Sequence, residues 1–89
     1  MKHRYLEVTF RRGKPFAAYL YLPRRIGAKA ARTEDQGRGL LIDFDDSGTP
    51  VGIEITAPSV ATISDVNQLL TKLGIEPLPS EEWAPLRAA

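Results

Sequence analysis

The sequence predicts an α+β domain: a small, mainly antiparallel β-meander of about five strands with one C-terminal α-helix packed on it. Three observations lead to this prediction. Residues 1–56 repeatedly alternate apolar and polar side chains, the pattern of half-buried strands. Residues 63–74 change to the spacing of an amphipathic helix. Glycines and prolines, which favour turns, separate these segments.

Three strands are predicted in the first 35 residues. Residues 5–10, YLEVTF, alternate Leu, Val and Phe with polar or aromatic side chains. Residues 16–22, FAAYLYL, repeat the alternation and place Tyr19 and Tyr21 opposite the leucines. Residues 28–35, AKAARTED, are poor in β-branched side chains, so we expect this strand at an edge of the sheet.

Residues 40–55, LLIDFDDSGTPVGIEI, are predicted to form the central hairpin. Its strands, 40–44 and 51–55, flank an Asp-Asp-Ser-Gly turn in which Gly48 supplies the left-handed backbone conformation. The expected register pairs apolar residues across the hairpin: Phe44 with Val51, Ile42 with Ile53, and Leu40 with Ile55. One face of the hairpin then belongs to the core, and the other carries Leu41, Asp43, Gly52 and Glu54.

A helix is predicted over residues 63–74, with Ser64 as its N-cap and Gly74 as its C-terminal stop. Its apolar stripe, Val66, Leu69, Leu70 and Leu73, is expected to pack on the sheet or to face a second copy of the helix.

The tail, residues 75–89, is punctuated by prolines. Ser80 is expected to cap a single turn that runs through Trp83 and ends at Pro85. We expect Trp83 to anchor this tail, either to the body of the domain or to a partner.

Length and composition limit the possible functions. The 89 residues are expected to form one domain, 1–89, which hides only about 60–65% of its unfolded surface and has little room for a deep cleft. There is no cysteine, so disulfides and Cys-ligated zinc are excluded. The N-terminus lacks a signal-peptide core, and no apolar run approaches the roughly 20 residues that span a bilayer. We therefore expect a cytoplasmic protein that does not enter the membrane.

The net charge of +1 conceals a strong division of charge along the chain. Residues 1–32 carry nine basic side chains and one acidic one, a net +8, whereas residues 33–89 carry three basic and ten acidic ones, a net −7. Basic and acidic strands are expected to become neighbours and pair across the sheet. The alternative is a dedicated anion-binding face.

The same hairpin matches the spacing of a calcium loop. The matching side chains are Asp43, Asp45, Ser47, Gly48 and Glu54, at positions one, three, five, six and twelve of an EF-hand. An EF-hand loop joins two helices, however, and this segment is flanked by strand patterns on both sides. We therefore interpret the carboxylates as turn formers and expect neither a metal nor a cofactor, with Asp43, Asp45, Ser47 and Glu54 as the weak candidates for calcium.

We expect no enzymatic activity and no catalytic residues. The only histidine, His3, lies near a terminus that is expected to fray, so a Ser-His-Asp triad has no well-placed base. Asp43 and Glu54 are expected to lie diagonally across the hairpin but to face solvent, without the burial that separates the pKa values of an acid-base pair.

The alternative function is nucleic-acid binding through the N-terminal hairpin. Outward tyrosines can stack on bases while arginines neutralise phosphates. The candidate residues are Arg11, Arg12, Tyr19, Tyr21, Arg24 and Arg25. Because tyrosines in a small sheet more often serve packing, protein interaction is favoured over this alternative.

The segments ARTED and GLLIDFDDSGTPVGIEI, followed by a proline and a leucine-rich helix, resemble a family of small bacterial proteins classed only as a domain of unknown function. The hallmark is a D-x-D-x-x-G-x-x-x-G-I-E-I hairpin, and the resemblance covers about Tyr19 to Ile55, with the helical tail matched loosely. It implies a compact β-sheet domain without known catalytic residues. Some members are suspected to sit beside small toxin-like proteins, which implies an antitoxin-like partner role.

The leading expectation is therefore a non-enzymatic domain for protein interaction or self-association, as a homodimer or as the partner of another small protein. The basic first hairpin is longer and more charged than expected for the family, so the resemblance does not imply nucleic-acid binding.

Overall fold

The computed structural model describes residues 4–23 and 27–87, with only the backbone described for Val60, Ala61 and Arg87. Three residues considered above, His3, Arg24 and Arg25, lie outside the described residues. Among the described residues, no helix is both long and apolar enough to cross a membrane.

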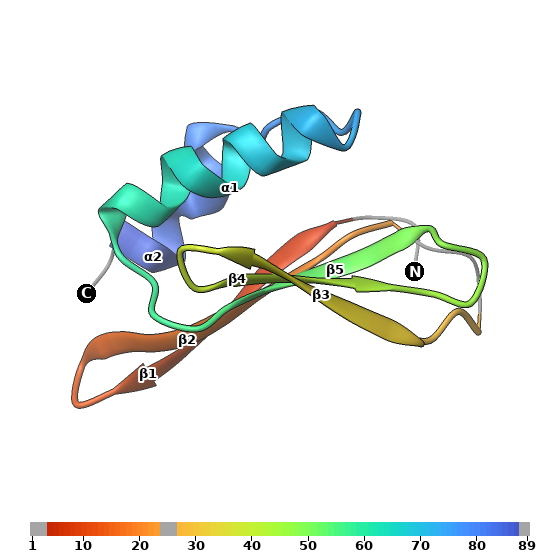
Figure 1. Ribbon diagram of the computed structural model, residues 1–89. Helices are drawn as coiled ribbons and strands as arrows, with labels where there is room; N and C mark the ends of the chain where they lie inside the picture. Colours follow the sequence, from red (N-terminus) through yellow and green to blue (C-terminus); the bar gives the residue numbers. More distant parts are fainter. Residues whose placement is uncertain (1–3, 24–26, 88–89) are drawn as a thin grey trace.

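The fold is a five-stranded antiparallel sheet with all of its helices on one side (Figure 1). The strands are β1 (Tyr5–Arg11), β2 (Lys14–Tyr21), β3 (Arg32–Gly37), β4 (Leu40–Phe44) and β5 (Pro50–Ile55). The predicted α+β class is confirmed.

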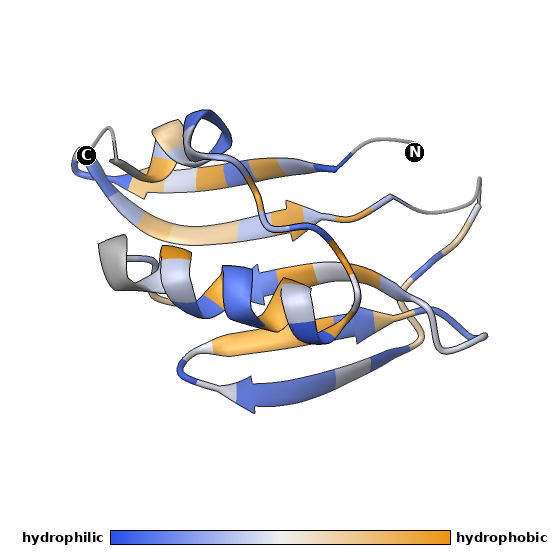
Figure 2. Cartoon of the chain, turned by 90° about the horizontal axis from the view of Figure 1, so that it is seen from above, coloured by the Kyte–Doolittle hydropathy of each residue, from blue (hydrophilic) through white to orange (hydrophobic). Residues whose placement is uncertain are grey.

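The order of the strands, β1-β2-β5-β4-β3, departs from the consecutive order of a meander, because β2 pairs with β5. The strand with the most buried residues, β5, thereby lies in the centre, while every residue of β3 is exposed at the edge. Figure 2 shows β3 as a largely hydrophilic edge strand. The predicted edge position of the third strand is confirmed, but its predicted start at Ala28 is wrong. The strand begins at Arg32, and the alanines before it offer little side-chain surface for pairing.

The central hairpin has the predicted register at two of its three pairs, Leu40 with Ile55 and Ile42 with Ile53. The third prediction is wrong, because Phe44 pairs with Pro50. An irregularity after Asp43 leaves one extra residue on β5, and the alternation shifts there.

Two hairpins turn through an Arg-Gly pair with positive φ at both residues. These pairs are Arg12-Gly13, with φ of 55° and 78°, and Arg38-Gly39, with φ of 56° and 76°. Such a turn matches the right-handed twist of the flanking strands and gives a tight two-residue connection. Gly48 also has the predicted positive φ, 85°.

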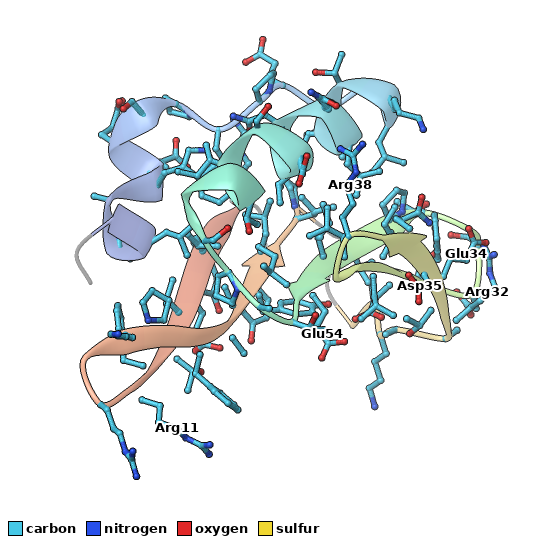
Figure 3. The ribbon with its side chains drawn as sticks, turned by 60° about the vertical axis from the view of Figure 1, so that its left-hand side comes forward. Arg11, Arg32, Glu34, Asp35, Arg38 and Glu54 are labelled. Carbon is cyan, nitrogen blue, oxygen red and sulfur yellow. The ribbon has the colours of Figure 1, made fainter. Side chains whose placement is uncertain are left out.

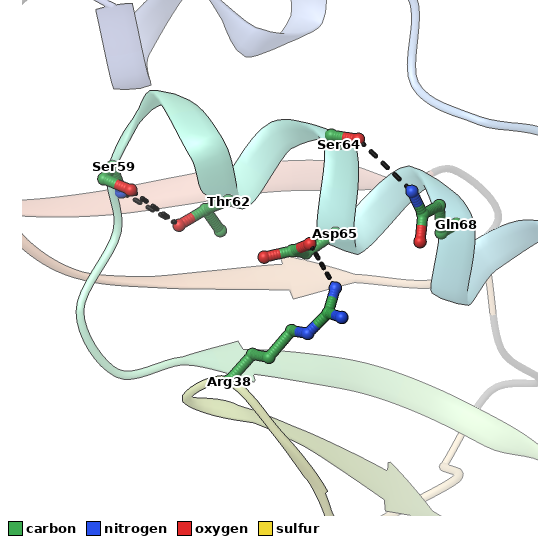
Figure 4. Close-up of polar contacts among 6 residues, drawn as sticks. All are labelled: Arg38, Ser59, Thr62, Ser64, Asp65 and Gln68. Atoms are coloured by element: carbon green, nitrogen blue, oxygen red, sulfur yellow. Dashed lines mark hydrogen bonds and ion pairs between the residues drawn. The ribbon is translucent and has the colours of Figure 1, made fainter.

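Helix α1 (Val60–Lys72) starts earlier than predicted, and Ser64 is not its N-cap. The N-cap is Ser59, whose backbone N–H donates to the Thr62 hydroxyl over 2.9 Å (Figure 4). Ser64 instead lies on the exposed side of the helix, where its hydroxyl accepts a long hydrogen bond from Gln68. The C-terminal stop at Gly74 is confirmed by its φ of 76°.

The tail forms two further short helices, η1 (Ser80–Trp83) and α2 (Ala84–Arg87), where one turn was predicted. Pro85 does not end the helical structure, because the first turn of a helix tolerates proline. The predicted anchoring of the tail to the body of the domain is confirmed, since Trp83 is 1% exposed within the core.

The core lies between the sheet and the helical layer. Its buried residues are Ala18, Leu20, Leu22, Leu40, Ile42, Ile53 and Ile55 from the sheet side, Val66, Leu69 and Leu70 from α1, and Leu78, Trp83 and Leu86 from the tail. The Arg38 guanidinium donates to Asp65 over 2.8 Å and ties the β3–β4 turn to α1 (Figure 4). None of the helices in the described part of the chain covers the opposite side of the sheet.

Candidate interaction surface on the open sheet face

The side of the sheet that faces away from the helices is called the open face below. Glu54 and Arg11 both point away from the helical layer on this side (Figure 3). Strand pairing forms two rows that cross all five strands on this face. The glutamate row contains Glu7, Tyr19, Glu54, Leu41 and Asp35, and the tyrosine row contains Tyr5, Tyr21, Gly52, Asp43 and Thr33.

Three tyrosines on β1 and β2 form one cluster on this face. The rings of Tyr5 and Tyr21 are stacked with centroids 4.4 Å apart. The rings of Tyr19 and Tyr21 pack edge to face with centroids 4.7 Å apart. Both arrangements are favoured for aromatic pairs. Tyr5 is 46% exposed, so the cluster presents aromatic surface to solvent as predicted for an outward-facing pattern.

Tyr19 is held in place by a glycine and an aspartate. A Cβ atom at Gly52 would collide with the Tyr19 ring and hydroxyl, so only glycine leaves room for the ring to lie there. The Tyr19 hydroxyl then donates to Asp43 over 2.7 Å, and the Thr33 hydroxyl donates to the same carboxylate over 2.6 Å. Asp43 thereby links β2, β4 and β3. The sequence reasoning missed this contact, although a glycine inside a strand is a known sign of close approach by another group.

The Tyr21 hydroxyl lies beside another carboxylate. It donates to Glu7 over 3.3 Å. Burial raises the pKa of Tyr21 above its ordinary value, and the negative charge of Glu7 raises it further. The polar ends of both inner tyrosines are therefore directed at carboxylates.

Glu54 is an exposed carboxylate on the central strand of the open face. It lies between Tyr19 and Leu41 in the glutamate row. Its side chain forms no hydrogen bond or ion pair with any residue that the structure describes. A charged group in this position, beside aromatic rings, is available to a binding partner.

The described members of the predicted platform of tyrosines and arginines fall into two separate places. Arg11 and Arg12 are exposed at the tip of the β1–β2 hairpin, where the Arg11 guanidinium lies 4.1 Å from the centre of the Phe16 ring. Arg11 is four residues along β1 from Glu7, the cross-strand neighbour of Tyr19, which corresponds to roughly 13 Å. The tyrosines are thus surrounded by carboxylates, and the arginines of the tip lie apart from them.

The calcium-loop residues serve different parts of the hairpin. Asp45 is 5% exposed, and its Oδ1 accepts hydrogen bonds from the Ser47 N–H, the Ser47 hydroxyl and the Thr49 N–H, over 2.9, 2.7 and 3.0 Å. Asp43 is bound to Tyr19 and Thr33, and Glu54 is exposed on β5. Within the described parts of the chain, no three acidic or histidine side chains form a group that could hold a metal ion. The interpretation of these carboxylates as turn and strand residues therefore accounts for their contacts.

Comparison with known protein families gives one result. Residues 17–58 match a family described as a protein of unknown function (DUF2283). The match agrees with the resemblance based on the hairpin hallmark, and it includes Tyr19, Asp43 and Gly52. Strand β1 and the helical layer lie outside the matched segment. No curated protein and no solved structure matches the chain.

Proposed function

We propose that this protein is a non-enzymatic interaction domain whose open face binds another small protein or a second copy of the chain. The proposal rests on one observation: a cluster of three tyrosines and an exposed Glu54 lie on a sheet face that no described helix covers. Tyrosine is enriched at protein interfaces because its ring supplies a large contact area and its hydroxyl a hydrogen bond. The antitoxin-like role implied by the resemblance would use this face for the second protein.

The environment of the carboxylates supports a non-enzymatic role. Both Asp43 oxygens accept hydrogen bonds, one from Thr33 on the adjacent strand β3 and one from Tyr19 on β2, and Glu54 is exposed to solvent. Acid-base chemistry by two carboxylates depends on burial of at least one of them, and Glu54 lies exposed on the sheet face.

Site-specific photo-crosslinking in cells tests the use of the open face. A benzophenone amino acid in place of Tyr5 would probe the tyrosine cluster, and the same group in place of the exposed Gln68 on α1 is the matched control. We expect a discrete protein adduct, either a doubled chain or one heterologous species, from position 5 and not from position 68. The absence of any protein adduct at position 5 would contradict the proposal.

Nucleic-acid binding is the second candidate, favoured by the exposed Arg11, Arg12 and Lys14 at the hairpin tip. The carboxylates around the tyrosines oppose it, because they repel the phosphates of any strand whose bases stack on those rings. Size-exclusion chromatography with light scattering and the absorbance ratio, at low and high salt, distinguishes the two functions. Nucleic acid that co-purifies and is released by salt would favour this second candidate, whereas a protein complex free of nucleic acid would exclude it.

A further inference from the structure

Opposite charges lie at equal distances from one uncharged pair on the open face. Thr9 and Ala17 are paired across β1 and β2. Glu7 precedes Thr9 by two residues along β1, and Arg11 follows it by two. Each therefore lies roughly 7 Å from Thr9 along the strand. Arg11 is paired with Lys14, so both ends of this strand pair carry charge, negative on one side of Thr9 and positive on the other.

We infer that the open face of one molecule binds the open face of a second copy, related by a two-fold axis at the Thr9–Ala17 pair; this inference rests on the proposed function. The axis lies in the plane between the sheets and runs perpendicular to the strands. Rotation about it places Arg11 over Glu7 of the second copy, and the symmetry forms this contact twice. The small side chains of Thr9 and Ala17 at the axis allow the two sheets to approach to about 10 Å.

The same rotation brings together other groups with complementary chemistry. Lys14 lies over Tyr19 of the second copy, with Glu54 beside it in the glutamate row. An ammonium group is attracted both by a tyrosine ring and by a carboxylate. Arg11 is already oriented by the Phe16 ring, which is 47% exposed in the single molecule. Dimer formation would therefore pair the basic side chains of the hairpin tip with carboxylates of the second copy. It would also cover much of the exposed aromatic surface of this hairpin.

The expected dimer is weak and sensitive to salt. The overlap runs along β1 from Glu7 to Arg11 and covers mainly β1 and β2, an area of roughly 13 by 10 Å on each copy, with β5 flanking it. Stable protein interfaces bury about 800 Å² on each partner, which is considerably more. Attraction between exposed charges also falls as salt screens them. We expect a dimer that forms at high protein concentration and dissociates on dilution or in high salt.

Charge reversal tests the arrangement by analytical ultracentrifugation over a range of protein concentrations. One variant reverses the tip, Arg11→Glu with Lys14→Glu, and a second reverses the glutamate row, Glu7→Lys with Glu54→Lys. We expect each variant alone to be monomeric and an equal mixture of the two to regain the dimer, because each tip then meets a face of opposite charge. The control, Glu81→Lys with Glu82→Lys on the helical side, should keep the wild-type dimer.

A cysteine crosslink across the axis provides a second measurement if reversal of Glu7 unfolds the domain. The chain has no cysteine, and a residue on a two-fold axis faces its own copy across the gap of about 10 Å between the sheets, so a short bis-maleimide should join Thr9→Cys into a covalent dimer. Gln68→Cys on α1 is the control and should remain a monomer under the same dilute conditions. A wild-type protein that is monomeric at all concentrations, or a mixture that stays monomeric while Thr9→Cys forms no dimer, would overturn the inference. A heterologous protein adduct at position 5 would still support the proposed function in that case.

Discussion

At the scale of single residues, the most consequential position is Gly52. Its missing side chain provides the space that the ring of Tyr19 occupies, and the Tyr19 hydroxyl reaches Asp43 on the next strand but one. A glycine within a strand normally weakens it, because it adds backbone entropy to the unfolded chain and contributes no packing. Here the tyrosine ring supplies that packing from a neighbouring strand.

We expect Gly52→Ala to lower the free energy of unfolding by about 1–3 kcal/mol, the usual cost of overpacking. The new methyl group would displace Tyr19 and break its hydrogen bond to Asp43. In a Tyr19→Ala background the clash is absent, and the same substitution should be neutral or stabilising by about 0.5–1 kcal/mol. Urea unfolding of the four proteins measures this coupling, and an equal cost in both backgrounds would show that Tyr19 does not fill the space above Gly52.

Tyr21 should ionise at a higher pH than an ordinary tyrosine, and Glu7→Gln should lower the pKa of Tyr21. Burial raises this pKa first and Glu7 adds to it, so removal of the charge should leave the part caused by burial. Because the folded-state pKa is the higher one, Tyr21 stabilises the fold below its ordinary pKa of about 10. This contribution is lost as the pH rises through the raised value. NMR titration of the Tyr21 ring carbons measures the shift, and identical curves with and without Glu7 would contradict the assigned cause.

At the scale of secondary-structure elements, local sequence signals determine where turns occur more reliably than where helices begin. The Arg-Gly turns and the hairpin at Gly48 have the backbone conformations that their glycines favour. Helix α1 shows the opposite case, because both Ser59 and Ser64 are suitable N-caps. The chain uses the earlier one, which follows Pro58 and allows Thr62 to complete the cap.

We expect Thr62→Val to destabilise the domain by about 1 kcal/mol, whereas Ser64→Ala should change its stability by less than about 0.5 kcal/mol. Valine keeps the shape of the buried Thr62 side chain but removes the hydroxyl that accepts the Ser59 N–H. Ser64 is exposed and makes only a long contact to Gln68. Chemical denaturation of both variants checks the position of the cap, and a larger loss for Ser64→Ala would place the helix start where the sequence pattern predicted it.

At the scale of the whole molecule, the helical layer closes only one side of a single sheet. The C-terminal tail completes this layer, with Leu78, Trp83 and Leu86 buried in the core. The Asn67 side chain accepts the Leu78 N–H over 3.0 Å and holds the tail beside α1. The core thus depends on residues from the end of the chain, while the opposite face of the sheet remains available for binding.

Trp83→Ala should leave the domain largely unfolded. Removal of a buried tryptophan side chain costs about 3–5 kcal/mol, which approaches the total stability of a small domain. Trp83→Phe should cost less than that, because the indole N–H has no acceptor among the described residues and no hydrogen bond is lost. Thermal unfolding followed by circular dichroism compares the three proteins, and a wild-type midpoint for Trp83→Ala would show that the tail is not part of the core.

Much of the fold can be predicted from the sequence, but less of the candidate surface. The alternating segments identify five strands, and the outward positions of Tyr19, Tyr21 and Glu54 follow from their parity in those strands. Alternation alone does not reveal which residues of different strands lie side by side. The separation of Arg11 from the tyrosines and the contact between Tyr19 and Asp43 both depend on the pairing of the strands.

The sequence by itself determined the α+β class, the edge position of the third strand, and the pairing of Leu40 with Ile55 and Ile42 with Ile53. These features depend on periodicity and on turns between neighbouring segments, which act over short distances along the chain. Only the tertiary structure decided that β2 lies beside β5 and that Trp83 closes the core. The reason is that such contacts join distant segments, and the arrangement that buries the most apolar surface cannot be evaluated one segment at a time.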